Sequence, residues 1–431
     1  MKRILPLGAL ISATLLCVPA FAQTPVAQTE FTVQVAAQRM ALAVAPANGS
    51  TDPILSNNLD TTLNHTLKLT GLFDFVPTGS FLPGLTTETH AKTNYDNWYA
   101  SGAQVVIKTQ ATVVGNSVTL DFGLYDVTAN RRIDIDYGNK TVSADKYRTV
   151  VYAFVNAVVK YFTGEPGFFG QSMLAVTRDG KGKGGRVVRL LTDGSGISRV
   201  TKVNTIELLP AWGPSGTVML TSYASGNPDL YTVSSSGAGH RISSAPGMNS
   251  GADYCAGNGR IALTLSKDGN AEIYTMASDG SDLRRLTNNR AIDTSPSWSP
   301  DCSQLAFVSD RGGNPQIYKM NADGSNVTRL TMVGKYNTNP AWGRKGYIAF
   351  SARDEQNALD IFTMRSDGSE LMRITQQQGK NDSPTWSPDG RYLAFTSTRD
   401  GSSRIYISTA DGKSQNPATT SGWYENPVWG R

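Results

Sequence analysis

The sequence is poor in the residues that build catalytic and metal centres. Only three histidines and three cysteines occur among 431 residues. His65, His90 and His240 lie far apart, and none has a second ligand at a spacing that zinc sites use. There is no Gly-x-Ser-x-Gly turn of a serine hydrolase, and the glycine-rich stretch 179–186 lacks the Lys-Ser/Thr of a phosphate-binding loop. We therefore predict a protein that is not an enzyme and that holds no cofactor or metal.

Charged residues are also scarce, at 17% of the sequence, and the two signs nearly balance. The net charge is +5, and it falls to +3 (38 − 35) without Lys2 and Arg3. Because no basic stripe interrupts this balance, we expect no nucleic-acid partner.

Long apolar runs are absent after the first 22 residues. Two basic residues precede an apolar stretch at 4–18 and a small-x-small site at 20–22. This order is typical of a secretory signal peptide, and the stretch is too short for a permanent membrane helix. We predict that residues 1–22 are cleaved and that the mature chain begins at Gln23 as a soluble protein.

Two cysteines remain in that mature chain, Cys255 and Cys302. Export to an oxidising compartment permits a disulfide between them. Buried free thiols are the simpler interpretation and the one that we favour, with the disulfide left open.

A repeat dominates the second part of the sequence. Two phrases recur, of which "SPTWSPDGRYLAF" from Ser383 and "SDGSELMRIT" from Ser366 are clear copies. The glycine of the second phrase returns every 43 or 44 residues, at positions 194, 237, 280, 324, 368 and 412. An aromatic residue of the first phrase keeps the same period: Trp212, Tyr254, Trp298, Trp342, Trp386 and Trp429. Each period contains three or four short strands and no helix signal, which predicts a six-bladed β-propeller over residues 168–431.

The ends of the repeat indicate how the ring closes. The first copy, at 168–180, has strands but no Pro-x-Trp, whereas the last residues, 425–431, are a Pro-x-Trp strand with nothing after it. We predict that this C-terminal strand completes the first blade. The repeated Trp is expected to pack between adjacent blades, since a ligand cage would not need six copies.

Residues 23–163 lack the period and predict a small α/β domain. Asp52 and Pro53 mark a helix start, Leu55, Leu59, Leu63 and Leu67 form its apolar face, and Gly71 ends it. Strands are expected at 31–37, 103–114, 117–127 and 131–142, and a second helix at 144–164. The stretch "GEPG" at 164–167 is interpreted as a hinge to the propeller.

The loops that precede each Pro-x-Trp should converge on the mouth of the propeller channel. They are polar and vary between copies while the framework repeats, which favours a protein-binding ring over loops that are merely polar. The predicted partner-binding residues are Met248, Asn249, Gly251, Asp293, Thr294, Ser295, Thr338, Asn339, Asp382, Ser383, Glu425 and Asn426.

These features together resemble the TolB family of the Tol–Pal cell-envelope system. The resemblance rests on the Pro-x-Trp-Ser-Pro-Asp-Gly repeat and on three further stretches: "TGLFDFV" at 70–76, "NWYASGAQVVIKTQ" at 97–110 and "YFTGEPGFFGQSMLAVT" at 161–177. It covers nearly the whole mature chain. The chain departs from the family pattern at Met248, where a His is familiar, and at Ser295, where a Glu is.

The resemblance implies a periplasmic scaffold that supports outer-membrane constriction at cell division. It implies binding of the lipoprotein Pal at the channel mouth, use by colicins, and binding of TolA through an N-terminal segment that contains Gln23, Thr24, Glu30 and Phe31. We expect a monomer that reaches the membrane only through its partners. A propeller that binds or processes a small ligand, glycan or peptide is the alternative.

Overall fold

The computed structural model describes residues 39–135, 137–178 and 184–430. The predicted signal peptide and the predicted strand at 31–37 lie outside these ranges, as does most of the glycine-rich stretch. Within the described part, the predicted order of an α/β domain followed by a six-bladed β-propeller is confirmed.

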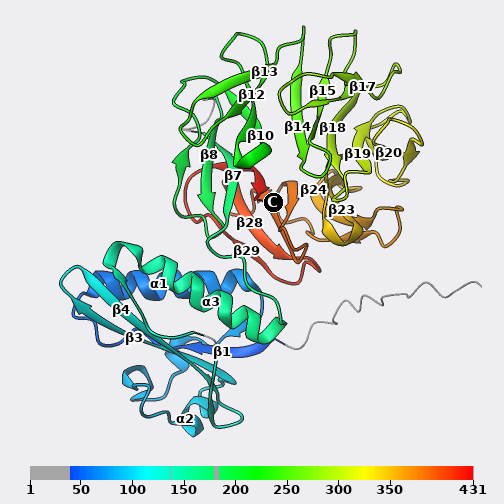
Figure 1. The fold of residues 1–431 in the computed structure, drawn as a ribbon. Helices are drawn as coiled ribbons and strands as arrows, with labels where there is room; N and C mark the ends of the chain where they lie inside the picture. Colours follow the sequence, from blue (N-terminus) through cyan, green and yellow to red (C-terminus); the bar gives the residue numbers. More distant parts are fainter. Residues whose placement is uncertain (1–38, 136, 179–183, 431) are drawn as a thin grey trace, which may run out of the picture. The chain divides into compact units, whose positions relative to one another are not determined.

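The α/β domain is built on a six-stranded sheet in the order β2-β1-β3-β4-β5, with β6 also paired to β4. The strands are β1 Met40–Val44, β2 Phe73–Phe75, β3 Val105–Val114, β4 Ser117–Asp126, β5 Arg131–Ile133 and β6 Lys140–Ser143. Helices α1 (Pro53–Thr70) and α3 (Tyr147–Thr163) cover one face, as Figure 1 shows, and α2 (Tyr95–Ala100) belongs to the other side.

Helix α1 begins and ends where the local signals predict. The Asp52 carboxylate accepts hydrogen bonds from the Ile54 and Leu55 amides at 2.9 and 3.1 Å, which satisfies two free donors of the first turn. Gly71 ends the helix with a φ of +68°. The four leucines of the predicted apolar face are all buried.

The predicted strand at 131–142 is wrong as a single element. Ile133 pairs with Leu124 and Lys140 with Leu120, so the six residues between the first and last of these (134–139) face only three (121–123). The ladder cannot continue across this mismatch, and within it Tyr137 packs its ring against Phe122 and Phe154 at the edge of the core. One predicted strand therefore becomes β5 and β6.

Each blade of the propeller is a four-stranded antiparallel sheet with its first strand innermost (Figure 1). Blade 1 contains β30 Tyr424–Trp429, β7 Ser172–Thr177, β8 Arg186–Leu191 and β9 Ser198–Arg199; blade 2 contains β10 Glu207–Trp212, β11 Val218–Ser222, β12 Asp229–Val233 and β13 Gly239–Ser243. Blade 3 contains β14 Asn249–Cys255, β15 Arg260–Leu265, β16 Glu272–Ala277 and β17 Arg284–Arg285; blade 4 contains β18 Asp293–Trp298, β19 Gln304–Ser309, β20 Gln316–Asn321 and β21 Thr328–Arg329. Blade 5 contains β22 Asn337–Trp342, β23 Tyr347–Arg353, β24 Leu359–Arg365 and β25 Met372–Arg373; blade 6 contains β26 Asn381–Trp386, β27 Tyr392–Ser397, β28 Arg404–Thr409 and β29 Gln415–Pro417.

The ring closes as predicted, because β30 pairs antiparallel with β7 and becomes the inner strand of blade 1. The repeated Trp also packs as predicted: Trp298 lies in one apolar cluster with residues of blade 3, and Trp342 in one with residues of blade 4.

The periodic glycines join neighbouring blades as well as forming turns. All six have a positive φ, between +74° and +90°. At five of them an added Cβ would lie 3.0 Å or less from a carbonyl oxygen of the preceding blade, and at Gly237 it would lie at 3.4 Å. The glycine therefore recurs because the turn of one blade rests directly on the backbone of another.

Blades 3 and 4 are also joined covalently. Cys255 and Cys302 form a disulfide, so the expectation of free thiols is wrong. Cys302 stands in a turn position that Gly390 occupies in blade 6, and both have a positive φ, +61° and +69°. The two cysteines thus come from adjacent blades whose turns meet.

The α/β domain shares a hydrophobic core with blades 1 and 6. This core includes Leu67 and Phe154 of the helices and Phe168, Tyr392 and Trp429 of the propeller. The Tyr392 hydroxyl donates to the Thr70 carbonyl at 3.2 Å, and the Asn416 amide to the Lys68 carbonyl at 2.9 Å. The role of residues 164–167 as a hinge stays a prediction.

Removal of residues 427–431 should lower the melting temperature by many degrees. The deletion takes Val428 and Trp429 away from β7 and leaves the core between blades 6 and 1 open. Thermal unfolding followed by circular dichroism measures this effect, and an unchanged melting temperature would contradict closure by β30.

Gly324→Ala should destabilise the protein more than Gly313→Ala. Both glycines lie in blade 4 with similar φ values, +87° and +97°, so both alanines carry a strain of roughly 1–2 kcal/mol. An added Cβ at Gly324 would also lie 2.7 Å from the Leu286 carbonyl oxygen, whereas nothing lies within 4 Å at Gly313. This clash should cost about 1–3 kcal/mol more. Equal losses in denaturant unfolding would show that the contact between blades is unimportant.

Candidate functional site

The six inner strands all begin at one end of the channel, here called the start mouth, and all end at the other, the end mouth. Near the start mouth every inner strand has a β-bulge just before or within its Pro-x-aromatic segment, which in blade 3 begins with Ala252 in place of Pro. The third residue of each strand has a φ between +49° and +61°: Leu209, Gly251, Ser295, Asn339, Ser383 and Asn426. The bulge therefore repeats around the channel and presents six different residues at equivalent backbone positions.

The bulges are fixed by hydrogen bonds to the preceding blade. The amides of Ser295, Ser383 and Asn426 donate to hydroxyl groups of Thr264, Ser351 and Thr396 at 3.0–3.2 Å. These acceptors lie on β15, β23 and β27, one blade earlier in each case. The backbone at the start mouth is thus a rigid frame.

The side chain of the first residue of the inner strands connects neighbouring blades. The Asn337 amide donates to Gln316 Oε1 at 2.8 Å and the Asn381 amide to Asp360 Oδ1 at 2.9 Å, each in the preceding blade. Asn249 and Asp293 occupy the same position and are fully buried. Asn249 Oδ1 accepts from the Ser243 hydroxyl at 2.7 Å.

Asn249 and Asp293 were among the predicted partner-binding residues, and the structure places both inside the frame. Asp293 Oδ2 accepts from Asn289 at 2.8 Å and forms an ion pair with Arg311 at 2.8 Å. Burial raises the pKa of the Asp293 carboxyl, although its hydrogen bonds and Arg311 oppose this shift. A buried side chain with these partners holds the blades together and has no surface for a second protein.

The other ten predicted residues gather at the start mouth and are half-buried: Met248, Gly251, Thr294, Ser295, Thr338, Asn339, Asp382, Ser383, Glu425 and Asn426. The two carboxylates among them are paired. Asp382 accepts from the Asn339 amide at 2.9 Å and lies 3.2 Å from Lys380, and Glu425 lies 3.2 Å from Arg178. The two carboxylates of the start mouth therefore lie on blades 6 and 1.

Apolar side chains are exposed around the rest of this mouth, and sequence reasoning missed them. They lie on the start-mouth side of blades 2, 4 and 5, with none among the described residues of blade 3, and we call them the apolar arc: Val203, Ile206, Leu209, Tyr223, Ile292, Met332 and Val333. Met332 and Val333 are 69% and 64% exposed. The signal was present as single apolar residues inside loops that otherwise read as polar. Several exposed apolar side chains at one mouth favour a protein-binding surface there.

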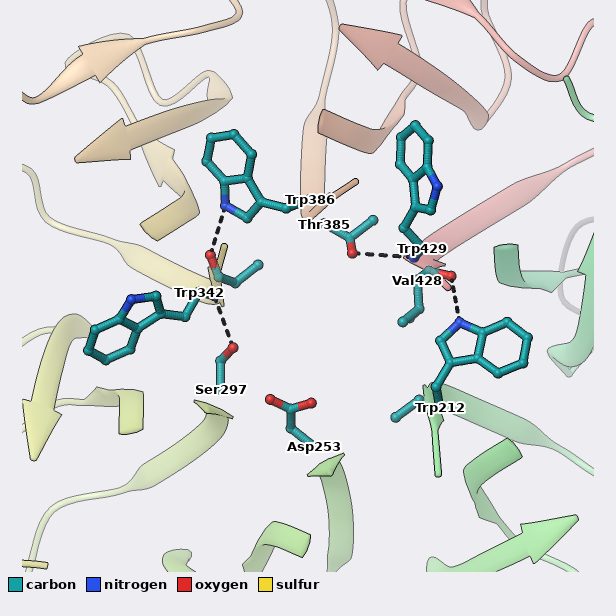
Figure 2. A pocket seen from close by; sticks show the side chains of 10 residues that line it. Trp212, Asp253, Ser297, Trp342, Thr385, Trp386, Val428 and Trp429 are labelled. Carbon is teal, nitrogen blue, oxygen red and sulfur yellow. Dashed lines mark hydrogen bonds between the residues drawn. The ribbon is translucent and has the colours of Figure 1, made fainter. Parts of the chain in front are cut away.

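The end mouth holds only a small cavity of about 70 Å³. Figure 2 shows the indoles of Trp212, Trp342, Trp386 and Trp429 around it, with Asp253 and Ser297 between them. Sites for small molecules usually have volumes of about 300–1,000 Å³. This cavity is therefore too small for a sugar or a peptide.

The residue before each aromatic decides how neighbouring inner strands are joined here. Where it is Ser297 or Thr385, its hydroxyl accepts the main-chain N–H of the next blade's Trp, at 3.0 and 3.3 Å. Asp253 does the same with its carboxylate at 2.8 Å. After Ala341 and Val428, the next Trp instead donates its indole N–H to their carbonyls, at 3.1 and 3.3 Å (Figure 2). The lining is thus part of the blade junctions.

Across the described ranges, no group of three or more His, Cys, Asp or Glu residues could hold a metal ion. His65 contacts the Asp193 and Ala418 carbonyls of the propeller, and His90 contacts Tyr125 within the α/β domain. In the same ranges no helix is long and apolar enough to cross a membrane. Gln23, Thr24, Glu30 and Phe31 lie outside the described residues, so their predicted role stays a prediction.

Two family models match the chain. One is described as the TolB beta propeller domain and matches residues 159–358 and 347–431; the other, the TolB amino-terminal domain, matches residues 32–133. A TolB homolog of Chlorobium luteolum is 32% identical over 281 residues, which are 63% of this chain and 62% of the relative. The Tol-Pal system protein TolB of Syntrophus aciditrophicus is 36% identical over 228 residues, 51% of this chain and 47% of the relative. The chain thus matches about half to three-fifths of the length of these curated relatives.

A solved structure is similar over a longer range. The crystal structure of TolB from Acinetobacter baumannii superimposes with a TM-score of 0.76 at 25% identity, and the match covers 91% of this chain and 97% of that one. Both the α/β domain and the propeller therefore have counterparts in one solved protein.

Proposed function

The chain belongs to the TolB family, and on that premise we propose that it is a non-enzymatic periplasmic scaffold of the Tol–Pal system. It binds the lipoprotein Pal at the start mouth and TolA through its N-terminal segment, and so supports outer-membrane constriction during division. The apolar arc is the observation that carries the proposal. It is an exposed apolar surface on a rigid frame, beside polar residues that differ from blade to blade.

The separation of apolar and paired charged residues at the start mouth supports a protein partner. Apolar contact on blades 2, 4 and 5 supplies affinity, and the paired charges of Asp382 and Glu425 on the other side supply orientation. Met248 and Ser295 depart from the family pattern and lie at this mouth. We expect the facing surface of Pal in the same organism to differ correspondingly.

The alternative, a propeller that binds or processes a small ligand, gains no support from the channel. Its end-mouth cavity is small, and its lining residues are occupied by contacts between blades. Soluble sugars should therefore leave the melting temperature unchanged.

Ile292→Asp and Val333→Asp should each weaken Pal binding by about tenfold or more. Both side chains belong to the apolar arc and are 52% and 64% exposed, so a buried carboxylate would replace an apolar contact in the complex. Leu283→Asp is the matched control, because Leu283 is 42% exposed in a turn before β17, away from the start mouth. Calorimetric titration with purified Pal measures all three. Wild-type affinity in both arc variants would overturn this assignment, and no binding to the wild-type protein would overturn the function.

Replacement of residues 23–35 by a Gly/Ser segment of equal length should abolish TolA binding and change the affinity for Pal by about fivefold or more. If the segment either packs on the protein or binds TolA, the free energy of its ordering contributes to both equilibria. The affinity for TolA and the affinity for Pal are then coupled. Titrations of Pal into both forms measure this coupling. Identical Pal affinities would argue against it without affecting Pal binding itself.

A further inference from the structure

Two blades of the propeller hold one of their own arginine side chains in the same way, at a position here called the arginine seat. In blade 4, Arg311 donates from Nη2 to Asp293 Oδ2 and from Nε to Ser309 Oγ, both at 2.8 Å. Its guanidinium lies over the Tyr318 ring, 5.1 Å from the centroid. The seat thus consists of an acceptor on the first strand, a serine on the second and a tyrosine on the third.

Blade 6 repeats this arrangement. Arg399 donates to Asn381 Oδ1 at 3.1 Å and to Ser397 Oγ at 2.9 Å. It lies 4.3 Å from the centroid of Tyr406. In blade 3, Lys267 takes the corresponding position over Tyr274 at 5.3 Å. A cation over this tyrosine is therefore the rule in three blades.

Blade 2 has the seat without the cation. In the strand register, Glu207 lies opposite Ser222, just as Asp293 lies opposite Ser309 in blade 4. Tyr231 likewise lies opposite Leu220, as Tyr318 lies opposite Phe307. The residue in the arginine position is Ala224. Its amide donates to Ser222 Oγ at 3.3 Å, just as the Arg311 amide donates to Ser309 Oγ at 3.3 Å.

A groove of about 310 Å³ opens at this place, between blades 1 and 2. Glu207, Ser222, Ala224 and Tyr231 all line it, with apolar walls from Val203, Leu220 and Val233. Among the described residues no cation lies over the Tyr231 ring: Arg241 is paired with Asp229 at 3.2 Å. Lys202 lines the groove as well, but its side chain is exposed and makes no contact over that ring. The same junction has the loosest glycine contact, at Gly237.

The carboxylate of this groove is buried. Glu207 is 1% exposed, and it accepts hydrogen bonds from the Val187 amide and the Thr201 hydroxyl. Burial raises the pKa of its carboxyl, since desolvation disfavours the charged form, although its two hydrogen bonds and the charges of Arg186 and Arg199 oppose this shift. A further cation, bound inside the groove, would stabilise that charge more.

We propose that the groove between blades 1 and 2 binds an arginine side chain of a protein partner, which supplies from outside the cation that blades 4 and 6 carry themselves. Arginine fits better than lysine, because a planar guanidinium can stack on Tyr231 while it donates to Glu207 and Ser222. The groove lies outside the channel but shares Val203 with the apolar arc, so it adjoins the start mouth. The arginine contacts themselves are made by Glu207, Ser222 and Tyr231, none of which belongs to the arc.

The probe is an acetylated, amidated pentapeptide, Ser-Gly-Arg-Gly-Ser, observed by saturation-transfer NMR with the full-length protein. We expect binding in the millimolar range, and at least tenfold weaker binding when citrulline, the neutral isostere, replaces arginine. Free L-arginine should bind no more tightly than the peptide. Equal binding of the citrulline peptide, or a clear preference for free arginine, would overturn the proposal.

Ala224→Arg is the decisive variant, because Ala224 is exposed and the new side chain can fill the seat. It should abolish peptide binding and raise the melting temperature by a few degrees. Arg311→Ala is the matched control: it vacates the seat in blade 4 and should add a second equivalent of peptide binding. Unchanged binding in Ala224→Arg would place the peptide elsewhere and refute the assignment.

Discussion

A four-stranded sheet with two apolar faces is stable only between two others, and the rest of this propeller depends on that constraint. Every repeated feature serves the junction between one blade and the next. The Trp packs into the neighbouring sheet, the first residue of the inner strand bonds to the preceding blade, and the turn glycine rests on its backbone. Where blade 3 has Tyr254 in place of Trp, a disulfide joins it to blade 4.

The same constraint explains what remains for binding. Residues that hold the blades must repeat, so recognition is left to positions that no junction uses. Asn249 and Asp293 belong to the first kind, whereas Thr294 and Ser295, one and two residues later, are half-buried and belong to the proposed partner surface. If that surface binds a partner as proposed, frame and recognition residues alternate along a single strand, and partner specificity can change without loss of the ring.

Local signals and the repeat were enough to predict the architecture. Asp52 and Gly71 bound their helix because capping is decided within a few residues, and the 44-residue period implies the ring and its closure. Contacts between blades were beyond such reasoning. In the sequence, a polar residue at the start of a strand cannot be told from the last residue of the preceding loop, so the burial of Asn249 and Asp293 was missed. The disulfide depends on which turns meet across a junction, and the apolar arc on which loops share a mouth. The vacant position of Ala224 becomes visible only when the blades are aligned by their register.

The closure by β30 also bears on how the chain is delivered. The Thr177 hydroxyl of β7 donates to the Trp423 carbonyl, 246 residues further along the chain, and within the described part of the chain no nearer segment pairs with that edge of β7. Contacts of such long range form late in folding. If the chain is exported to the periplasm as proposed, blade 1 lacks its inner strand until β30 has crossed the membrane, and the ring stays open until then. A chain built in this way would remain threadable for most of its passage through a membrane pore and would become a closed body only on the far side.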